Sequence, residues 1–267
     1  MYEPVETIEY RGHDIKIYSD MDPLNPRVDY DNVGTMVCWH SRYNLGDEHD
    51  FSDPGTFWEE LVRQECPELD ERIEAARERT PWIAAQEEKC EAMIQRWIED
   101  WIERNLLVLP LYLYDHSGIT MNTGGFSCPW DSGQVGYIYV TKKRALEEWG
   151  GKRLTKERRE KFLNYLRGEV ETYDHYLTGS VYGYMIEANS DGVEAGYDCD
   201  DSCWGFFGYG RDTDWDYMIS EAKDAIDCEI RHVKRQRFET LKTLIKNKVP
   251  LAQRPERLGD VPLLTNI

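Results

Sequence analysis

The residues best suited to chemistry lie in 115–134, a polar segment between two apolar runs. Loops of this length inside compact domains are usually functional or disordered. Asp115, His116 and Ser117 follow directly on the first run, where a side chain is held firmly and still faces solvent. Asp115 would orient the His116 imidazole as a general base or as the partner of a nucleophile. Adjacent strand residues point to opposite faces, so the alternative is that Asp115 and Ser117 only cap the loop backbone.

Cys128 is the candidate nucleophile of the same segment, beside Asp115 and His116 as the other catalytic candidates. A cysteine attacks as the thiolate and therefore needs a nearby cation or a helix N-terminus, and the local sequence supplies neither. We therefore favour a pocket wall in which Trp130 stacks on a planar ligand. The ligand-binding candidates here are His116, Ser117, Ser127, Trp130, Asp131 and Ser132.

A second acidic stretch, 197–205, adds three ligand-binding candidates: Asp200, Asp201 and Trp204. Like 115–134, it breaks regular structure with glycine, aspartate and tryptophan. We therefore expect Trp130 and Trp204 to line one concave surface.

Neither acidic nor cysteine-containing segments carry a specific metal signature. Asp198, Asp200 and Ser202 have the spacing of a calcium loop, but Cys203 stands where that loop needs glycine. A zinc site can be drawn from the side chains of His116, Cys128, Cys199 and Cys203, but their spacing is not one of the specific zinc patterns. We expect no metal and no cofactor, and the sequence contains none of the common phosphate-loop, serine-hydrolase or zinc-protease motifs.

The elements that would position these residues form an α+β pattern. Five apolar stretches predict strands, at 14–18, 35–40, 106–114, 135–140 and 181–186. Apolar residues at helical spacing predict helices between them and a last helix over 215–246 with a break. The sequence predicts a single domain over 1–248, with a roughly five-stranded mixed sheet and helices mainly on one side, and an extended tail over 249–267.

The charge of the chain is strongly acidic and unevenly distributed. The sequence has 32 Lys and Arg against 51 Asp and Glu, a net charge of −19. Residues 1–105 hold 11 basic and 26 acidic residues, whereas 231–267 hold 9 and 3. This field opposes non-specific binding to nucleic acid and suits a basic protein partner. The alternative is a surface that its charge merely keeps soluble.

Three features of the sequence indicate the compartment in which the protein acts. No apolar run approaches the length of about eighteen residues that a membrane span needs, and the first residues do not resemble a signal peptide. Seven cysteines, scattered singly, are typical of reduced thiols. We expect a cytoplasmic protein of a bacterial host with no membrane partner. The oligomeric state stays open.

Several blocks together resemble one family: NPRVDYDNVGTMVCWHSRYNLGD, YDHSG with SCPWDSGQVGYIYV, GEVETYDHYLTGSVYGY and DSCWGFFG. The combination is similar to an uncharacterised family of bacteriophage and mobile-element proteins, over about residues 25–210. The family has no settled activity, so the resemblance implies no catalytic residue. It does imply an accessory protein that acts in the bacterial cytoplasm, a kind often directed against host defences.

Three functions are in competition, and the third, a structural virion component, is disfavoured by the site-like segments. The first is a counter-defence protein that binds a basic host effector or sequesters a small nucleotide-like signal. The second is a nucleotide or phosphoester hydrolase that uses Asp115, His116 and the carboxylates of 198–201. We predict binding, because the site-like segments come without a complete catalytic or metal signature.

Overall fold

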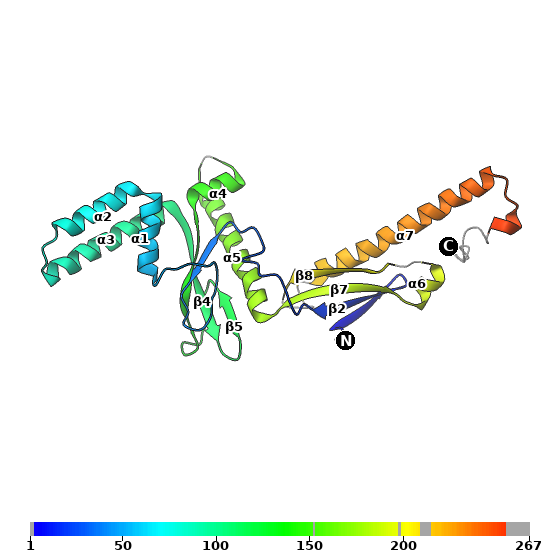
Figure 1. Cartoon of the computed structure of the whole chain (residues 1–267), viewed down its shortest axis with the longest axis horizontal. Coiled ribbons are helices and arrows are strands. Elements are labelled where there is room, and N and C mark those ends of the chain that lie inside the picture. The colour runs from blue at the N-terminus through cyan, green and yellow to red at the C-terminus, as the bar shows by residue number, and fades with distance from the viewer. Residues whose placement is uncertain (1–2, 152, 197–198, 209–214, 255–267) are drawn as a thin grey trace. The chain divides into compact units, whose positions relative to one another are not determined.

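The computed structural model describes residues 3–151, 153–196, 199–208 and 215–254 (Figure 1). The chain divides into two compact units. The parts of the chain up to Leu24 and from Gly179 onward form one, which we call the terminal unit, and Asn25–Thr178 forms the other, the inserted unit. The expected single domain over 1–248 stays a prediction, because compactness does not decide whether two units unfold together.

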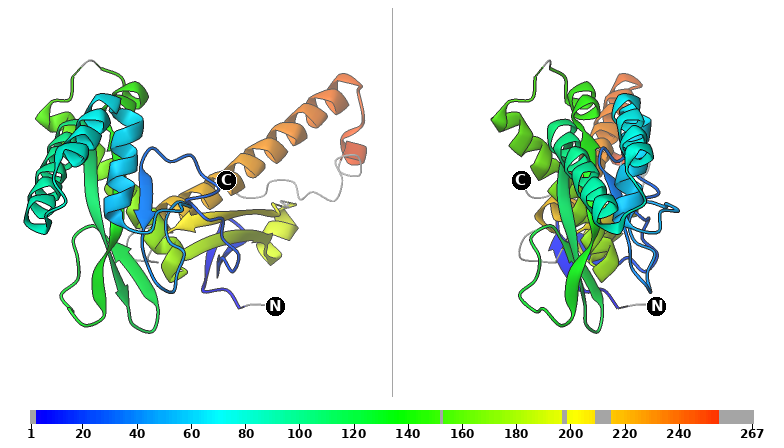
Figure 2. Two further views of the ribbon diagram at one scale, coloured as in Figure 1. Left: turned by 60° about the vertical axis from the view of Figure 1, so that its left-hand side comes forward. Right: turned by 90° about the vertical axis from the view of Figure 1, so that its left-hand side faces the viewer.

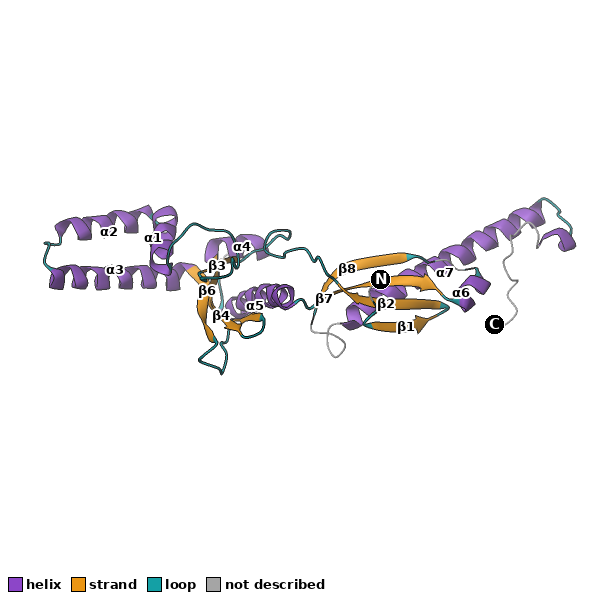
Figure 3. Ribbon diagram, turned by 60° about the horizontal axis from the view of Figure 1, so that its bottom comes forward, coloured by secondary structure: helices purple, strands orange, loops and turns teal. Residues whose placement is uncertain are grey.

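The α+β class is confirmed, but the single, roughly five-stranded mixed sheet is wrong. The strands form two four-stranded sheets, and each is antiparallel throughout and has its own helices (Figure 3). β2 (His13–Ser19) and β7 (Val181–Ala188) pair with each other in the terminal unit and not with β4 (Leu106–Asp115). Among the described residues, three hydrophobic cores therefore replace the one expected: one on each face of the inserted unit's sheet and one in the terminal unit.

The sheet of the inserted unit has the order β3-β6-β4-β5. It consists of β3 (Thr35–Cys38), β6 (Ser132–Thr141), β4 and β5 (Ile119–Asn122). The predicted strands 106–114 and 135–140 are neighbours in it, as expected, in β4 and β6. β4 has an unbroken apolar sequence because both of its faces are covered: Leu107 and Leu109 join the core on one face, and Val108 packs against the core on the other.

Helices cover both faces of this sheet, not mainly one. α4 (Lys142–Trp149) and α5 (Lys156–Thr178) pack on the face of Leu107. α1 (Pro54–Glu65) and α3 (Ala84–Asn105) contribute to the core on the other face. α2 (Pro67–Arg79) joins that core through Ile73, its only buried residue. A single buried position gives almost no helical pattern, which is why the sequence did not predict α2.

The terminal unit is a sheet with one long helix on one face. Its strand order is β1-β2-β7-β8, with β1 at Glu6–Tyr10 and β8 at Asp201–Phe207, and the short α6 (Ser190–Ala195) follows β7. α7 (Trp215–Lys246) is one continuous helix without the expected break. Its first half packs on the sheet through residues spaced by three or four: Trp215, Met218, Ala222, Ile226 and Ile230. Of the predicted tail over 249–267, a short 3-10 turn at Leu251–Gln253 is described, and 255–267 lie outside the described residues.

Candidate functional site

The segment 115–134 is not one long loop but a hairpin followed by a shorter loop. β5 pairs back onto the end of β4, so that Asp115 faces Ile119 and Tyr112 faces Asn122. The buried carboxylate of Asp174 accepts hydrogen bonds from the Met121 backbone, at 2.6 Å, and from the Thr120 hydroxyl. The turns at this end of the sheet lie opposite to the end that carries α1, α2 and α3 (Figure 2). The site candidates of this segment are therefore attached to a fixed sheet.

The two expected catalytic neighbours, Asp115 and His116, take different partners. The Asp115 carboxylate forms an ion pair with the Arg42 guanidinium. The His116 Nδ1 atom lies 3.3 Å from a carboxylate oxygen of Asp131, across the loop. The Asp115 backbone N–H donates to the Asp131 carbonyl at 2.8 Å, which holds the two strand ends together. The imidazole thus has an orienting carboxylate, but it is not the one that the sequence suggested.

Cys128 is poorly placed for nucleophilic attack. Its Sγ atom lies 3.9 Å from a carboxylate oxygen of Asp131, and a carboxylate repels the thiolate that attack requires. The Ser132 hydroxyl donates to the Cys128 carbonyl and so fixes the loop backbone. Ser117 and Ser127 are exposed, and Ser117 has a positive φ of 59° in the hairpin turn. These residues shape the loop, and among them only His116 has a partner typical of catalysis.

Trp130 lies at the edge of a hollow of about 320 Å³ in the inserted unit. The hollow is lined chiefly by polar residues, among them His40, Arg42, Asp115, Asp131 and Ser132. The Trp130 side chain is 91% exposed, so it stands in solvent and does not form a closed pocket wall. We call this region, with the neighbouring Tyr43, the Trp130 surface.

The loop 38–52 borders the Trp130 surface and forms a larger hollow of about 740 Å³. His40 lines both hollows: its ring stacks on Tyr43, and its Nδ1 atom accepts hydrogen bonds from the Arg42 and Tyr43 backbones. His40 is half-buried. Sequence reasoning missed Arg42, although Arg42 is the only Lys or Arg between Arg27 and Arg63 and stands out for that reason.

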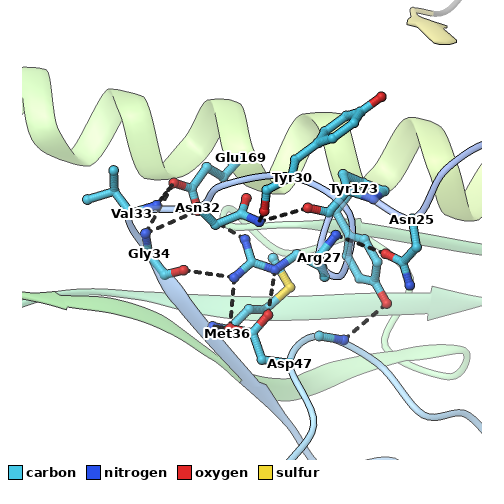
Figure 4. A network of polar contacts seen from close by, with 12 residues as sticks. Asn25, Arg27, Tyr30, Asn32, Val33, Gly34, Met36, Asp47, Glu169 and Tyr173 are labelled. Atoms are coloured by element: carbon cyan, nitrogen blue, oxygen red, sulfur yellow. Dashed lines mark hydrogen bonds and ion pairs between the residues drawn. The ribbon is translucent and has the colours of Figure 1, made fainter.

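A buried ionic network holds the loop 38–52 in place (Figure 4). Arg27, with its side chain 1% exposed, donates two 2.8 Å hydrogen bonds to Asp47 and one of 3.0 Å to Glu169. Glu169 also accepts from the backbones of Val33 and Gly34. Burial alone would lower the pKa of Arg27, but its bonds and charge pairing with the two carboxylates raise it, so the guanidinium stays charged. The network ties α5 and β3 to the loop.

The remaining candidates belong to the terminal unit. Asp200 is exposed, Asp201 begins β8 and binds the Ser202 backbone N–H, and Trp204 is 45% exposed. Asp198 lies outside the described residues. Since Trp130 and Trp204 belong to different units, the expected shared surface stays a prediction.

Neither the acidic nor the cysteine-rich stretch assembles a metal centre in the described part of the chain, where no group of three or more His, Cys, Asp or Glu side chains is arranged to hold an ion. Cys128 and His116 of the drawn zinc site belong to the inserted unit, and Cys199 and Cys203 to the terminal unit. The carboxylates of the Trp130 surface are instead paired with Arg42 and His116.

Comparisons with protein-family models, with curated proteins and with solved structures find no significant match. None of the helices in the described ranges combines the length and apolar character that crossing a bilayer requires. The geometry of the inserted unit is therefore the basis for a functional proposal.

The thiols should differ sharply in reactivity. Burial raises the pKa of Cys38 to about 12, and the nearby Asp47 carboxylate adds to the shift, whereas Cys203 and Cys228 are exposed. At pH 8 we expect iodoacetamide to modify the two exposed thiols at least about a hundredfold faster than Cys38, because only a thiolate reacts. Peptide mass spectrometry over time measures the rates. In urea the difference should vanish, and equal rates in the folded protein would contradict the burial of Cys38.

Proposed function

We propose that this chain acts by binding a partner protein through the Trp130 surface, and that as a phage-encoded accessory protein it thereby blocks a host effector. The observation that carries the proposal is the 91% exposure of Trp130. A large indole left in water beside an arginine and a tyrosine is typical of the energetic centre of a protein interface. Arg42 and Tyr43 are the arginine and the tyrosine of this surface, and the Arg42 guanidinium lies 5.5 Å from the centre of the Tyr43 ring.

The charge around Trp130 favours a partner with a basic surface. Asp115 and Asp131 lie in the same hollow, and the adjoining loop adds Asp47, Glu48 and Asp50. One of these carboxylates is paired with Arg42 and another with the buried Arg27, which leaves an acidic rim. Complementary charge speeds association and selects partners.

A small nucleotide-like signal fits the same surface less well. Small-molecule sites usually bury about 70–90% of the ligand. A base stacked on Trp130 would have its other face in water, because the indole itself projects from the surface. The carboxylates of Asp115 and Asp131 would also repel phosphate groups.

Hydrolysis is the second candidate, and one observation favours it. The distance of 3.3 Å between His116 Nδ1 and Asp131 places an orienting carboxylate on the imidazole, as in general-base catalysis. A hydrolase would also need donors for the developing charge of the phosphoester. The only strong cation of the hollow, Arg42, is paired with Asp115.

The test uses the full chain as bait in a bacterial lysate, followed by titration of each captured protein after purification. Trp130→Ala should weaken binding about thirtyfold or more, the effect of losing a hot spot worth about 2 kcal/mol. Tyr217→Ala is the control, because Tyr217 is an aromatic residue of the terminal unit, 67% exposed, that contributes nothing to the Trp130 surface.

The outcomes separate the candidates. Equal affinities of the wild type and Trp130→Ala would exclude the Trp130 surface as the binding site. Tight capture of a nucleotide, recovered unchanged after denaturation, would favour the small-ligand form of the proposal. Cleavage of a phosphoester that is lost in His116→Ala would decide for the hydrolase.

A further inference from the structure

The second half of α7 carries a concentrated positive charge on an otherwise acidic chain. Residues 231–248 contain seven Lys and Arg and one acidic residue, Glu239. Lys242 pairs with Glu239 at 2.8 Å, and Arg237 binds the Gly196 carbonyl. Among the described residues the other five pair with no carboxylate: Arg231, Lys234, Arg235, Lys246 and Lys248. Their charge is therefore not neutralised by any described carboxylate of the terminal unit.

Four of these cations, together with Lys242, share one face of the helix with two exposed apolar side chains. Phe238 and Ile245 are each 56% exposed and lie seven residues, or two turns, apart. The Lys242 ammonium lies 4.3 Å from the centre of the Phe238 ring. We call this set the α7 basic face: Arg231, Lys234, Arg235, Phe238, Lys242, Ile245 and Lys246. A nucleic acid would use only its charges and would be repelled by the net charge of −19. A protein with carboxylates around an apolar group would use both.

The inserted unit carries a face of that composition on its helical hairpin. Glu71, Glu74 and Glu78 recur at helical spacing along α2 and are exposed. All residues of 81–89 are exposed too, including Trp82 at 97% and Ile83 at 53%. We call Glu71, Glu74, Glu78, Trp82 and Ile83 the hairpin acidic face.

We propose that two copies of this chain associate, with the α7 basic face of one copy on the hairpin acidic face of the other. Glu71 and Glu78 are seven residues apart on α2, as are Arg235 and Lys242 on α7, so both pairs are separated by about 10 Å. Two ion pairs can therefore form at once between aligned helices. Phe238 and Ile245 would then be covered by Trp82 and Ile83, which removes apolar surface from water. This inference does not rest on the Trp130 surface, which contributes no residue to either face.

The experiment measures the mass of the full chain by sedimentation velocity over a range of concentrations. The wild type should associate at about 0.05 M salt and dissociate at about 0.5 M salt, because exposed charges are screened. One variant carries Arg235→Glu and Lys242→Glu, and a second carries Glu71→Lys and Glu78→Lys. Each variant alone should associate at least about a hundredfold more weakly than the wild type, because its two faces then carry like charges.

A mixture of the two charge-reversal variants tests whether the two faces pair with each other. In an equimolar mixture of the two variants every contact regains opposite charges, so association should return to near the wild-type level. Lys161→Glu, a reversal at a 73% exposed side chain of α5, is the control and should leave the mass unchanged. A wild type that stays monomeric at low salt, or a mixture that stays as weak as its components, would overturn the proposal.

Discussion

Replacing Arg27 by methionine should destabilise the inserted unit by about 3–5 kcal/mol, the usual cost of removing one partner of a buried ion pair. The substitution leaves Glu169, 8% exposed, and Asp47, 27% exposed, without their counter-charge. The loss should appear as a lower midpoint of urea unfolding, followed by tryptophan fluorescence.

A matched substitution and a rescue test the cause. Arg104→Ala removes an arginine from an exposed pair with Asp100 at 3.4 Å and should cost less than about 0.5 kcal/mol. Adding Glu169→Gln to Arg27→Met should recover part of the loss, because the amide oxygen can still accept from the Val33 and Gly34 backbones. If the double variant is no more stable than Arg27→Met, the unpaired carboxylate is not the source of the loss.

Among glycine-to-alanine substitutions, each of which adds one methyl group, Gly136→Ala should be the most damaging. It should lower the free energy of unfolding by about 3 kcal/mol or more. Gly136 lies in the middle of β6 and pairs with Cys38 on β3 and Leu111 on β4. A Cβ atom there would overlap the Val37 carbonyl oxygen, a backbone atom that cannot turn aside. β3 would have to move, and with it the loop 38–52 that follows it.

Gly133→Ala is the control for this change. Gly133 is on the same strand, and a Cβ atom there would meet nothing within 4 Å. We expect its stability to stay within about 0.5 kcal/mol of the wild type. Thermal unfolding of both variants measures the difference, and a Gly136→Ala variant as stable as Gly133→Ala would contradict the close approach of β3 and β6.

Sequence reasoning succeeded where a pattern was local and strong. The apolar run Leu106–Tyr114 was predicted as a strand, and it forms most of β4. It failed for pairings between distant segments: nothing in the apolar pattern of 14–18 shows that β2 pairs with β7. It also missed β1, whose alternating acidic residues are typical of an edge strand, and β5, whose four residues lie within a polar segment.

The candidate site shows the same division. His116 pairs with Asp131, and Trp130 lines the same hollow as Asp131, but a functional site in 115–134 stays a prediction. The exchange of partners, with Asp115 on Arg42 and His116 on Asp131, was not predictable, because it follows from how a hairpin and two loops meet in space. Arg42 was nevertheless visible as the single Lys or Arg of a long acidic stretch.

The order of the two units along the chain has a consequence for synthesis on the ribosome. β2 is complete by Ser19, but its partner β7 begins only at Val181, after the whole inserted unit. Until then the β1–β2 ribbon has no partner for the free edge of β2, and Ile15 and Ile17, both fully buried in the finished protein, remain uncovered. The Asp20 N–H binds the Val181 carbonyl at 2.8 Å, so the chain leaves and re-enters the terminal unit at adjacent points. Until β7 is made, the nascent chain therefore carries an unpaired strand edge with uncovered apolar side chains, and that interval is when the protein is most exposed to misassembly and chaperones.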